Sequence, residues 1–246
     1  MKTKLVLLHL FTILIFFVGC ASTHVALADM APVAVVTVTA NRTLPWLEKE
    51  EASNNGDAVD DADGLLSYAA NKLLGKNNVE ILTDQNRVDW AAESLNRLLE
   101  ETGGLEVVSP EKVVSSKTYT ESRENILNYM VALVSAGDYK NFMSIGAKKA
   151  RLFMDDIGAK SLVMANFTFQ KSCASGNKWT GEIAASVTME IRLLDSRGKE
   201  VLNRTYRAIS GETVPMRNRS YDKEALIELF PDTIDVAVNK FIMDCM

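Results

Sequence analysis

The sequence predicts a mixed α/β fold, with about five strands in one mixed sheet and helices packed on its faces. Segments rich in β-branched residues alternate with amphipathic helical segments along the first two thirds of the chain. Three strand-like segments joined by turns follow, which predicts a C-terminal three-strand antiparallel meander. The apolar content of 47% and the charged content of 24% are ordinary for a globular protein.

The first segment is typical of an export signal and is excluded from the fold. Lys2 and Lys4 precede an apolar run of about 14 residues, which is shorter than the roughly 20 residues that cross a bilayer as a helix. Gly19-Cys20 matches the processing site of bacterial lipoproteins. We therefore predict a lipoprotein signal peptide at 1–19 and lipidation at Cys20.

A second processing site stays open. Ala26-Leu27-Ala28 is an A-x-A sequence, and cleavage after it would release a soluble exported or periplasmic protein. With lipidated Cys20, the chain divides into the lipidated cysteine and a tether at 20–32 and a single domain at 33–246. Because no aspartate follows the cysteine, the expected location is the periplasmic face of the outer membrane, with membrane lipid as a partner.

Charge and histidine content exclude several functions. The net charge of −5 becomes −7 without Lys2 and Lys4, which disfavours nucleic acid as a partner. The two histidines, His9 and His24, both precede the domain, so a Ser-His-Asp triad, a histidine-ligated metal and a histidine base are excluded. No phosphate-binding or nucleophile-elbow motif occurs. We expect no catalytic residues, no metal and no cofactor.

The predicted elements follow in order from the hydrophobic pattern. A β-branched run gives the first strand, a cluster of acids gives a solvated loop, and a stripe of apolar residues repeating at helical spacing gives the longest early helix. Strict alternation gives the clearest strand, and Pro231 marks a kink or restart in the last helix. The predicted strands are 33–39, 105–108, 161–170, 183–193 and 200–210; the helices are 65–74, 85–101, 121–136, 141–157 and one from Lys223; the acidic loop is 48–63.

Two apolar features are candidates for contact with a membrane or a partner. Leu44, Trp46 and Leu47 form a cluster just beyond the first strand, where they would either insert at an interface or cover the core. Trp90 lies opposite the apolar stripe of its helix, where it would either touch a partner or be covered by another element.

Cys173 and Cys245 are the remaining cysteines. In an exported protein a lone pair suggests a disulfide, and two free thiols are the other interpretation.

Several segments together resemble a family of envelope lipoproteins. The likeness is to the fold shared by curli-secretion lipoproteins, penicillin-binding-protein activator lipoproteins and the N-terminal domain of TolB, and more narrowly to treponemal outer-membrane-associated lipoproteins. The broader likeness rests on exported Cys20, strand 33–39, helix 85–101 leading into strand 105–108 with Ser109-Pro110-Glu111-Lys112-Val113 after it, Asp156-Ile157-Gly158-Ala159-Lys160-Ser161-Leu162-Val163 and the hairpin around Leu194-Asp195-Ser196-Arg197-Gly198. The narrower likeness rests on the same strands with Leu44-Pro45-Trp46 and Glu80-Ile81-Leu82-Thr83. The resemblance implies non-enzymatic work in assembly, secretion or membrane permeability.

The sequence thus favours a lipid-anchored envelope protein whose helices and aromatic loops contact a membrane, an envelope partner or another copy of the chain. The alternative is a soluble exported module that binds a small ligand in a cleft between helices and sheet.

Overall fold

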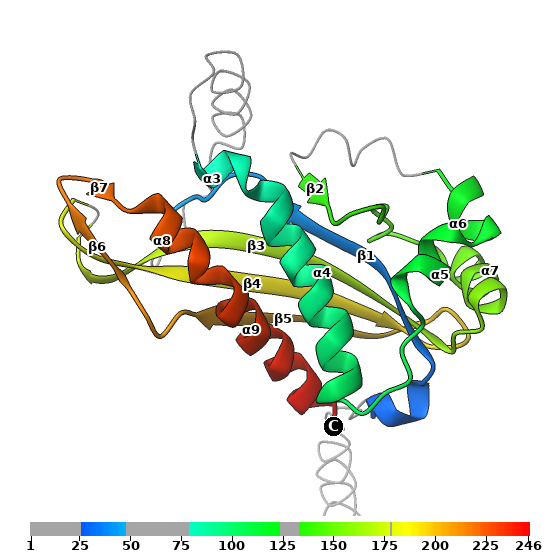
Figure 1. Cartoon of the computed structure of the whole chain (residues 1–246). Helices are drawn as coiled ribbons and strands as arrows, with labels where there is room; N and C mark the ends of the chain where they lie inside the picture. The colour runs from blue at the N-terminus through cyan, green and yellow to red at the C-terminus, as the bar shows by residue number, and fades with distance from the viewer. Residues whose placement is uncertain (1–25, 48–78, 124–132, 178) are drawn as a thin grey trace, which may run out of the picture.

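The computed structural model describes residues 26–47, 79–123, 133–177 and 179–246. A twisted sheet forms the centre, and helices cover it (Figure 1). The strands are β1 (Val33–Asn41), β2 (Leu133–Ser135), β3 (Ser161–Gly176), β4 (Gly181–Leu194), β5 (Glu200–Ile209), β6 (Val214–Arg217) and β7 (Ser220–Tyr221). The helices are η1 (Leu27–Met30), α3 (Val79–Leu82), α4 (Asp84–Glu101), α5 (Pro110–Ser115), α6 (Lys117–Glu121), α7 (Ala147–Ile157), α8 (Lys223–Glu228) and α9 (Phe230–Cys245).

The sheet is mixed, and its topology confirms the predicted fold class. Seven strands lie in the order β2-β1-β3-β4-β6-β7, and β5 also pairs with β4. Only β1 and β3 are parallel; the other neighbours are antiparallel. The meander of β3, β4 and β5 is the predicted C-terminal one. The long strand β4 pairs with β5 along one half and with β6 at its beginning.

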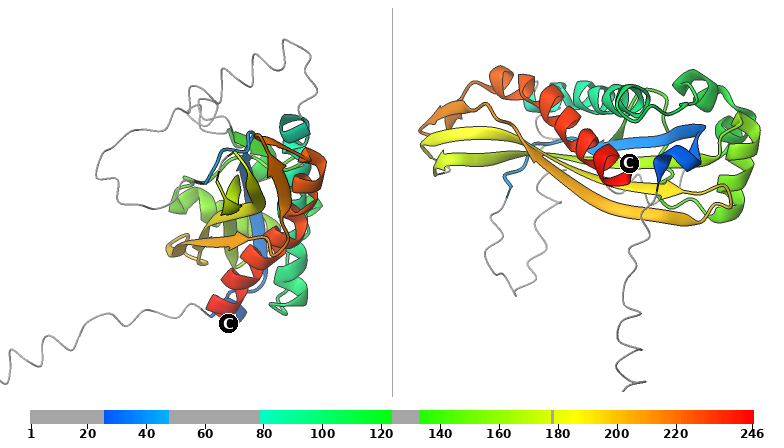
Figure 2. Two further views of the ribbon diagram at one scale, coloured as in Figure 1. Left: turned by 90° about the vertical axis from the view of Figure 1, so that its left-hand side faces the viewer. Right: turned by 90° about the horizontal axis from the view of Figure 1, so that it is seen from below.

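The two longest helices pack on one face of the sheet (Figure 1, Figure 2). Each of the two helices carries an apolar stripe, and the side chains of this stripe are buried against the sheet. In α4 and α9 these are Val88, Ala91, Leu95, Leu99, Ile234, Ala237, Val238, Phe241 and Ile242. Pro231 stands in the first turn of α9, just after α8 ends, which confirms the predicted restart.

The fold begins before the end of the predicted tether. Leu27 is only 1% exposed and belongs to the hydrophobic core. The Ser161 hydroxyl donates to the carbonyl of Met30 at 2.9 Å, and the Lys160 amide donates to the carbonyl of Pro32 at 2.7 Å. Residues 27–32 are therefore part of the domain rather than of the tether.

Three predicted elements differ from the structure. Residues 105–108 form no strand: Val107 makes a single parallel bridge to Val33, because the segment turns into α5 at Pro110. Of the predicted helix 121–136, residues 124–132 lie outside the described residues, and 133–135 form β2, which pairs with β1, since an apolar run also suits a strand. The helix predicted from 141 begins at Ala147. Helix 65–74 and acidic loop 48–63 lie outside the described residues.

Candidate functional site

A cavity of about 490 Å³ opens where the parallel pairing of β1 with β3 ends, beyond the carboxyl end of β1 and beside the second half of β3. In the part of the chain that the structure describes, six side chains line it, and they come from four separate stretches: Trp46, Glu80, Lys171, Arg219, Tyr221 and Lys223. In Figure 1 this end of the molecule lies toward the labels α3 and β7, away from η1. Its volume is within the range of pockets that hold small molecules.

Pairing between β3 and the segment that follows β1 positions the inner wall of the cavity. The Asn41 side chain continues the pairing of β1 with β3, since its amide bonds both the carbonyl and the amide of Phe169. Beyond it, the Lys171 amide donates to the carbonyl of Pro45 at 2.8 Å, and the Leu47 amide donates to the carbonyl of Lys171 at 2.7 Å. This bridge holds the Trp46 ring beside Lys171, whose ammonium lies 5.6 Å from the ring centroid.

A buried ion pair forms the floor of the cavity. The Lys171 ammonium lies 3.3 Å from both carboxylate oxygens of Glu80 and donates to the Tyr221 hydroxyl at 3.1 Å. The Tyr221 hydroxyl in turn donates to Glu80. Burial lowers the pKa of Lys171, and Glu80 partly opposes this effect. Burial, together with the bond to Glu80, raises the pKa of Tyr221.

A buried arginine supports the helix that carries Glu80. Arg87 donates to the carbonyl of Glu80 at 2.9 Å and to the Thr83 hydroxyl at 2.8 Å. Its guanidinium lies 5.6 Å from the ring centroid of Phe169. Burial lowers the pKa of Arg87 to about 10, although Asp84 and Glu80 favour its charge. These bonds tie the single turn of α3 to α4 and hold the backbone of Glu80 in place.

The rim of the cavity comes from the hairpin of β6 and β7 and from the start of α8. Asn218 and Arg219 form the two-residue turn with φ of 51° and 63°, as in type I′ turns, where the second position favours glycine. The Arg219 guanidinium carbon lies 3.5 Å from the centroid of Trp179. Lys223 follows the hairpin, and its charge contributes to the lowered pKa of Lys171.

Counting the described residues alone, the lining of the cavity therefore combines three cations with one carboxylate, a net charge of +2, and two aromatic rings. This arrangement can bind an anion at the rim and hydroxyl groups at the floor. Among the described residues, no three His, Cys, Asp or Glu side chains lie together as metal ligands would.

The aromatic segment after the first strand is divided between core and cavity. Leu44 is buried in the core, as the second of its two predicted roles, covering the core, requires. Trp46 packs partly on the core and lines the cavity. Leu47 is half-buried beside it. Trp90 is half-buried and packs against the core as well. Cys20 lies outside the described residues.

The two remaining cysteines are free thiols rather than the predicted disulfide. Cys173 pairs with Ile183 on β4, whereas Cys245 ends α9 close to Arg204 and Tyr206 of β5. Because Arg204 pairs with Ile191, the two thiols lie about eight residues apart along β4, or roughly 26 Å. A disulfide requires Cα atoms within about 7 Å of each other.

Five of the residues that line the cavity were not predicted as site residues from the sequence: Lys171, Glu80, Arg219, Tyr221 and Lys223. One signal was available for Lys171. The inward positions of β3 run Ala165, Phe167, Phe169 and then Lys171, and a lysine at an inward position of a strand is uncommon without a partner. No comparable pattern marks the other four residues, because the fold alone brings them together.

Comparisons with known proteins leave the family open. No protein-family model matches the chain, and no curated protein matches it. Among solved structures, it is similar to the hypothetical protein CT253 from Chlamydia trachomatis, with 8% identity, 87% of this chain and 92% of that chain covered, and a TM-score of 0.33. It is also similar to lipoprotein GNA1162 from Neisseria meningitidis, with 14% identity, 85% and 98% covered, and a TM-score of 0.29.

In the part of the chain that the structure describes, no helix has the length and apolar character that crossing a membrane requires.

Proposed function

We propose that this protein is a non-enzymatic component of the bacterial cell envelope, held at the periplasmic face of the outer membrane by acyl chains on Cys20. Its domain would act by binding a ligand or an envelope partner. The leader and Gly19-Cys20 support the anchor. The position of both histidines before Leu27 supports a role without histidine-based catalysis.

The burial of Leu27 is the observation that most directly supports cleavage before Cys20, and with it the lipid-anchored form. Cleavage after Ala28 would remove Leu27 from the core, and burying such a side chain contributes about 2 kcal/mol. Cleavage before Cys20 keeps the whole of η1 and leaves only about six residues as a tether, with a reach of roughly 20 Å. The core thus favours the lipoprotein site over the A-x-A site.

The cavity favours ligand binding over lipid contact for the segment around Trp46. A tryptophan that inserts into a membrane needs its ring exposed, whereas Trp46 packs between the core and Lys171. This observation supports the binding of a small ligand by the domain. The burial of Leu27 argues against release of the domain as a soluble protein, because that cleavage would remove Leu27. Assembly, secretion and permeability remain the envelope roles that the resemblance implies.

Detergent-phase partitioning tests the anchor. We expect the native protein to enter the detergent phase and to incorporate labelled palmitate, because acyl chains on one cysteine dominate its partitioning. A Cys20→Ala variant should remain unlabelled, whereas Cys173→Ala should behave as the native protein does. Equal aqueous partitioning of the native and Cys20→Ala proteins would refute the anchor.

A further inference from the structure

The cavity combines a cationic rim, aromatic walls and a floor rich in hydrogen-bonding groups. We propose that it binds a small acidic sugar, a ring of hydroxyl groups that carries one carboxylate or phosphate. This proposal goes beyond the membrane anchor and does not depend on it, since the cavity lies at the other end of the domain from η1.

The rim supplies the anion-binding groups. Within the residues that the structure describes, no carboxylate lies within ion-pair distance of Arg219. Its guanidinium rests on Trp179, which restricts the side chain before a ligand arrives. A guanidinium binds a carboxylate or phosphate through two parallel hydrogen bonds. Lys223 adds a second positive charge at the same rim.

The backbone of Arg219 favours a role for its side chain. A φ of 63° at the second turn position suits glycine, and an arginine there costs about 1 kcal/mol. Residues with strained backbone conformations are concentrated at functional sites, so the strain at Arg219 favours a role for its side chain in binding.

The floor favours hydroxyl groups over a second anion. The carboxylate of Glu80 would repel a free phosphate that entered deeply, but it has acceptor positions beyond those that Lys171 and Tyr221 use. The Trp46 and Tyr221 rings flank Lys171 at 5.6 and 5.7 Å from its ammonium. A ligand with hydroxyls inward and its charge at the rim matches this distribution.

Isothermal titration calorimetry on the full chain in mild detergent tests the proposal. The probes are glucuronate, glucose 6-phosphate, uncharged glucose and inorganic phosphate. We expect at least one acidic sugar to bind about tenfold more tightly than glucose and inorganic phosphate, because only it engages rim and floor together. If neither acidic sugar binds, or if inorganic phosphate or glucose binds as tightly, the proposal is wrong.

Charge-matched variants locate the site. Arg219→Gln combined with Lys223→Gln should weaken the acidic sugar about tenfold or more, whereas Lys148→Gln combined with Arg151→Gln should leave it unchanged. The control residues are exposed on α7, which lies at the opposite end of the sheet from α3 and β7 in Figure 1. Equal loss in both double variants, or loss in neither, would exclude this cavity.

A further variant separates binding from folding. Arg219→Gly creates an Asn-Gly turn, which the two positive φ values favour, so its melting temperature should stay within about 2 °C of the native value. Binding of the acidic sugar should nevertheless fall as in the double variant. Retained binding in this well-folded variant would overturn the role of Arg219.

A second set of titrations identifies the source of the sugar. A free acidic monosaccharide and an oligosaccharide that ends in the same unit share the recognised chemistry. Tighter binding of the monosaccharide would indicate a free solute, and tighter binding of the oligosaccharide a glycan end. Because these titrations use Cys20→Ala protein in parallel, failure to bind sugar is distinguishable from failure of the anchor.

Discussion

At the scale of the residue, the structure shows how one charge is accommodated inside the sheet. Lys171 occupies an inward position of β3 that phenylalanines hold at 167 and 169, and it is 9% exposed. Glu80, Tyr221 and the Trp46 ring surround its ammonium. A buried ion pair of this kind adds little net stability, but removal of one partner leaves the other charge unpaired.

Replacing Lys171 should therefore destabilise the fold. We expect Lys171→Met to lower the free energy of unfolding by about 3 kcal/mol, because Glu80 would remain buried without its cation. Urea denaturation at pH 7 measures this change. The double variant Lys171→Met, Glu80→Gln should recover at least half of the loss, and strictly additive effects of the two substitutions would contradict the pairing.

A buried tyrosine predicts a loss of stability at alkaline pH. Burial raises the pKa of Tyr139 to about 12, against an ordinary value of 10.0. Between these values the unfolded chain is ionised at this residue while the folded chain keeps its proton. Stability is thus fully present below pH 10 and falls by about 2–3 kcal/mol as pH rises to 12.

Tyr139→Phe provides the measurement for this residue. The variant should lose less stability between pH 10 and 12 than the native protein does. Between pH 6 and 8, the denaturation midpoints of both proteins should show the same dependence on pH. An identical alkaline loss in both proteins would show that Tyr139 titrates normally in the fold.

At the scale of the element, periodic patterns predicted most of the fold. Alternation gave β4, and a stripe at helical spacing gave α4, because burial on one face imposes those periods. The segment at 133–135 became β2 because β1 offers it backbone partners that the sequence does not reveal. The cavity could not be predicted, since the one-turn helix α3 and the two-residue strand β7 leave no periodic signal.

The short element η1 gives a direct test of how the domain begins. Leu27→Ala should lower the free energy of unfolding by about 2–4 kcal/mol, because the removed side chain lies in the core. Thermal or urea denaturation measures the change. Leu152→Ala, at a position on α7 that is 51% exposed, is the matched control and should change stability by less than about 0.5 kcal/mol. Equal effects would show that η1 is not integrated.

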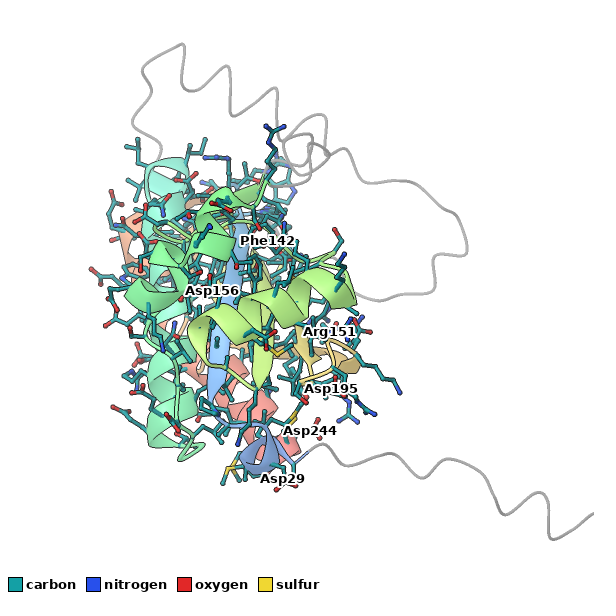
Figure 3. The ribbon with its side chains drawn as sticks, turned by 90° about the vertical axis from the view of Figure 1, so that its right-hand side faces the viewer. Asp29, Phe142, Arg151, Asp156, Asp195 and Asp244 are labelled. Atoms are coloured by element: carbon teal, nitrogen blue, oxygen red, sulfur yellow. The ribbon has the colours of Figure 1, made fainter. Side chains whose placement is uncertain are left out.

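At the scale of the whole molecule, the parallel pair of β1 and β3 has η1 at one end and the cavity at the other. η1 lies beside the amino ends of β1 and β3 and near the end of α9, as Figure 3 shows for Asp29 and Asp244. The cavity lies beyond the carboxyl end of β1 and beside the second half of β3. From Ser161 to Lys171 the strand covers ten residues, or about 33 Å.

Together with the lipid anchor proposed above, this separation predicts which end of the domain faces water. With the acyl chains at the η1 end, we expect the cavity end to remain in water when the native protein is incorporated into liposomes. Fluorescence of a Trp90→Phe variant, which keeps Trp46 and Trp179, should then be insensitive to brominated lipids. Strong quenching by these lipids would indicate that the aromatic segment contacts the bilayer.

The position of Leu27 also has a consequence for maturation in the cell. A chain trimmed at the A-x-A bond would lack a piece of its interior, so it would unfold more often and be degraded sooner by envelope proteases. Only the acylated species would then accumulate, even if the export machinery occasionally selected the wrong bond. Folding would act as a quality control on secretion.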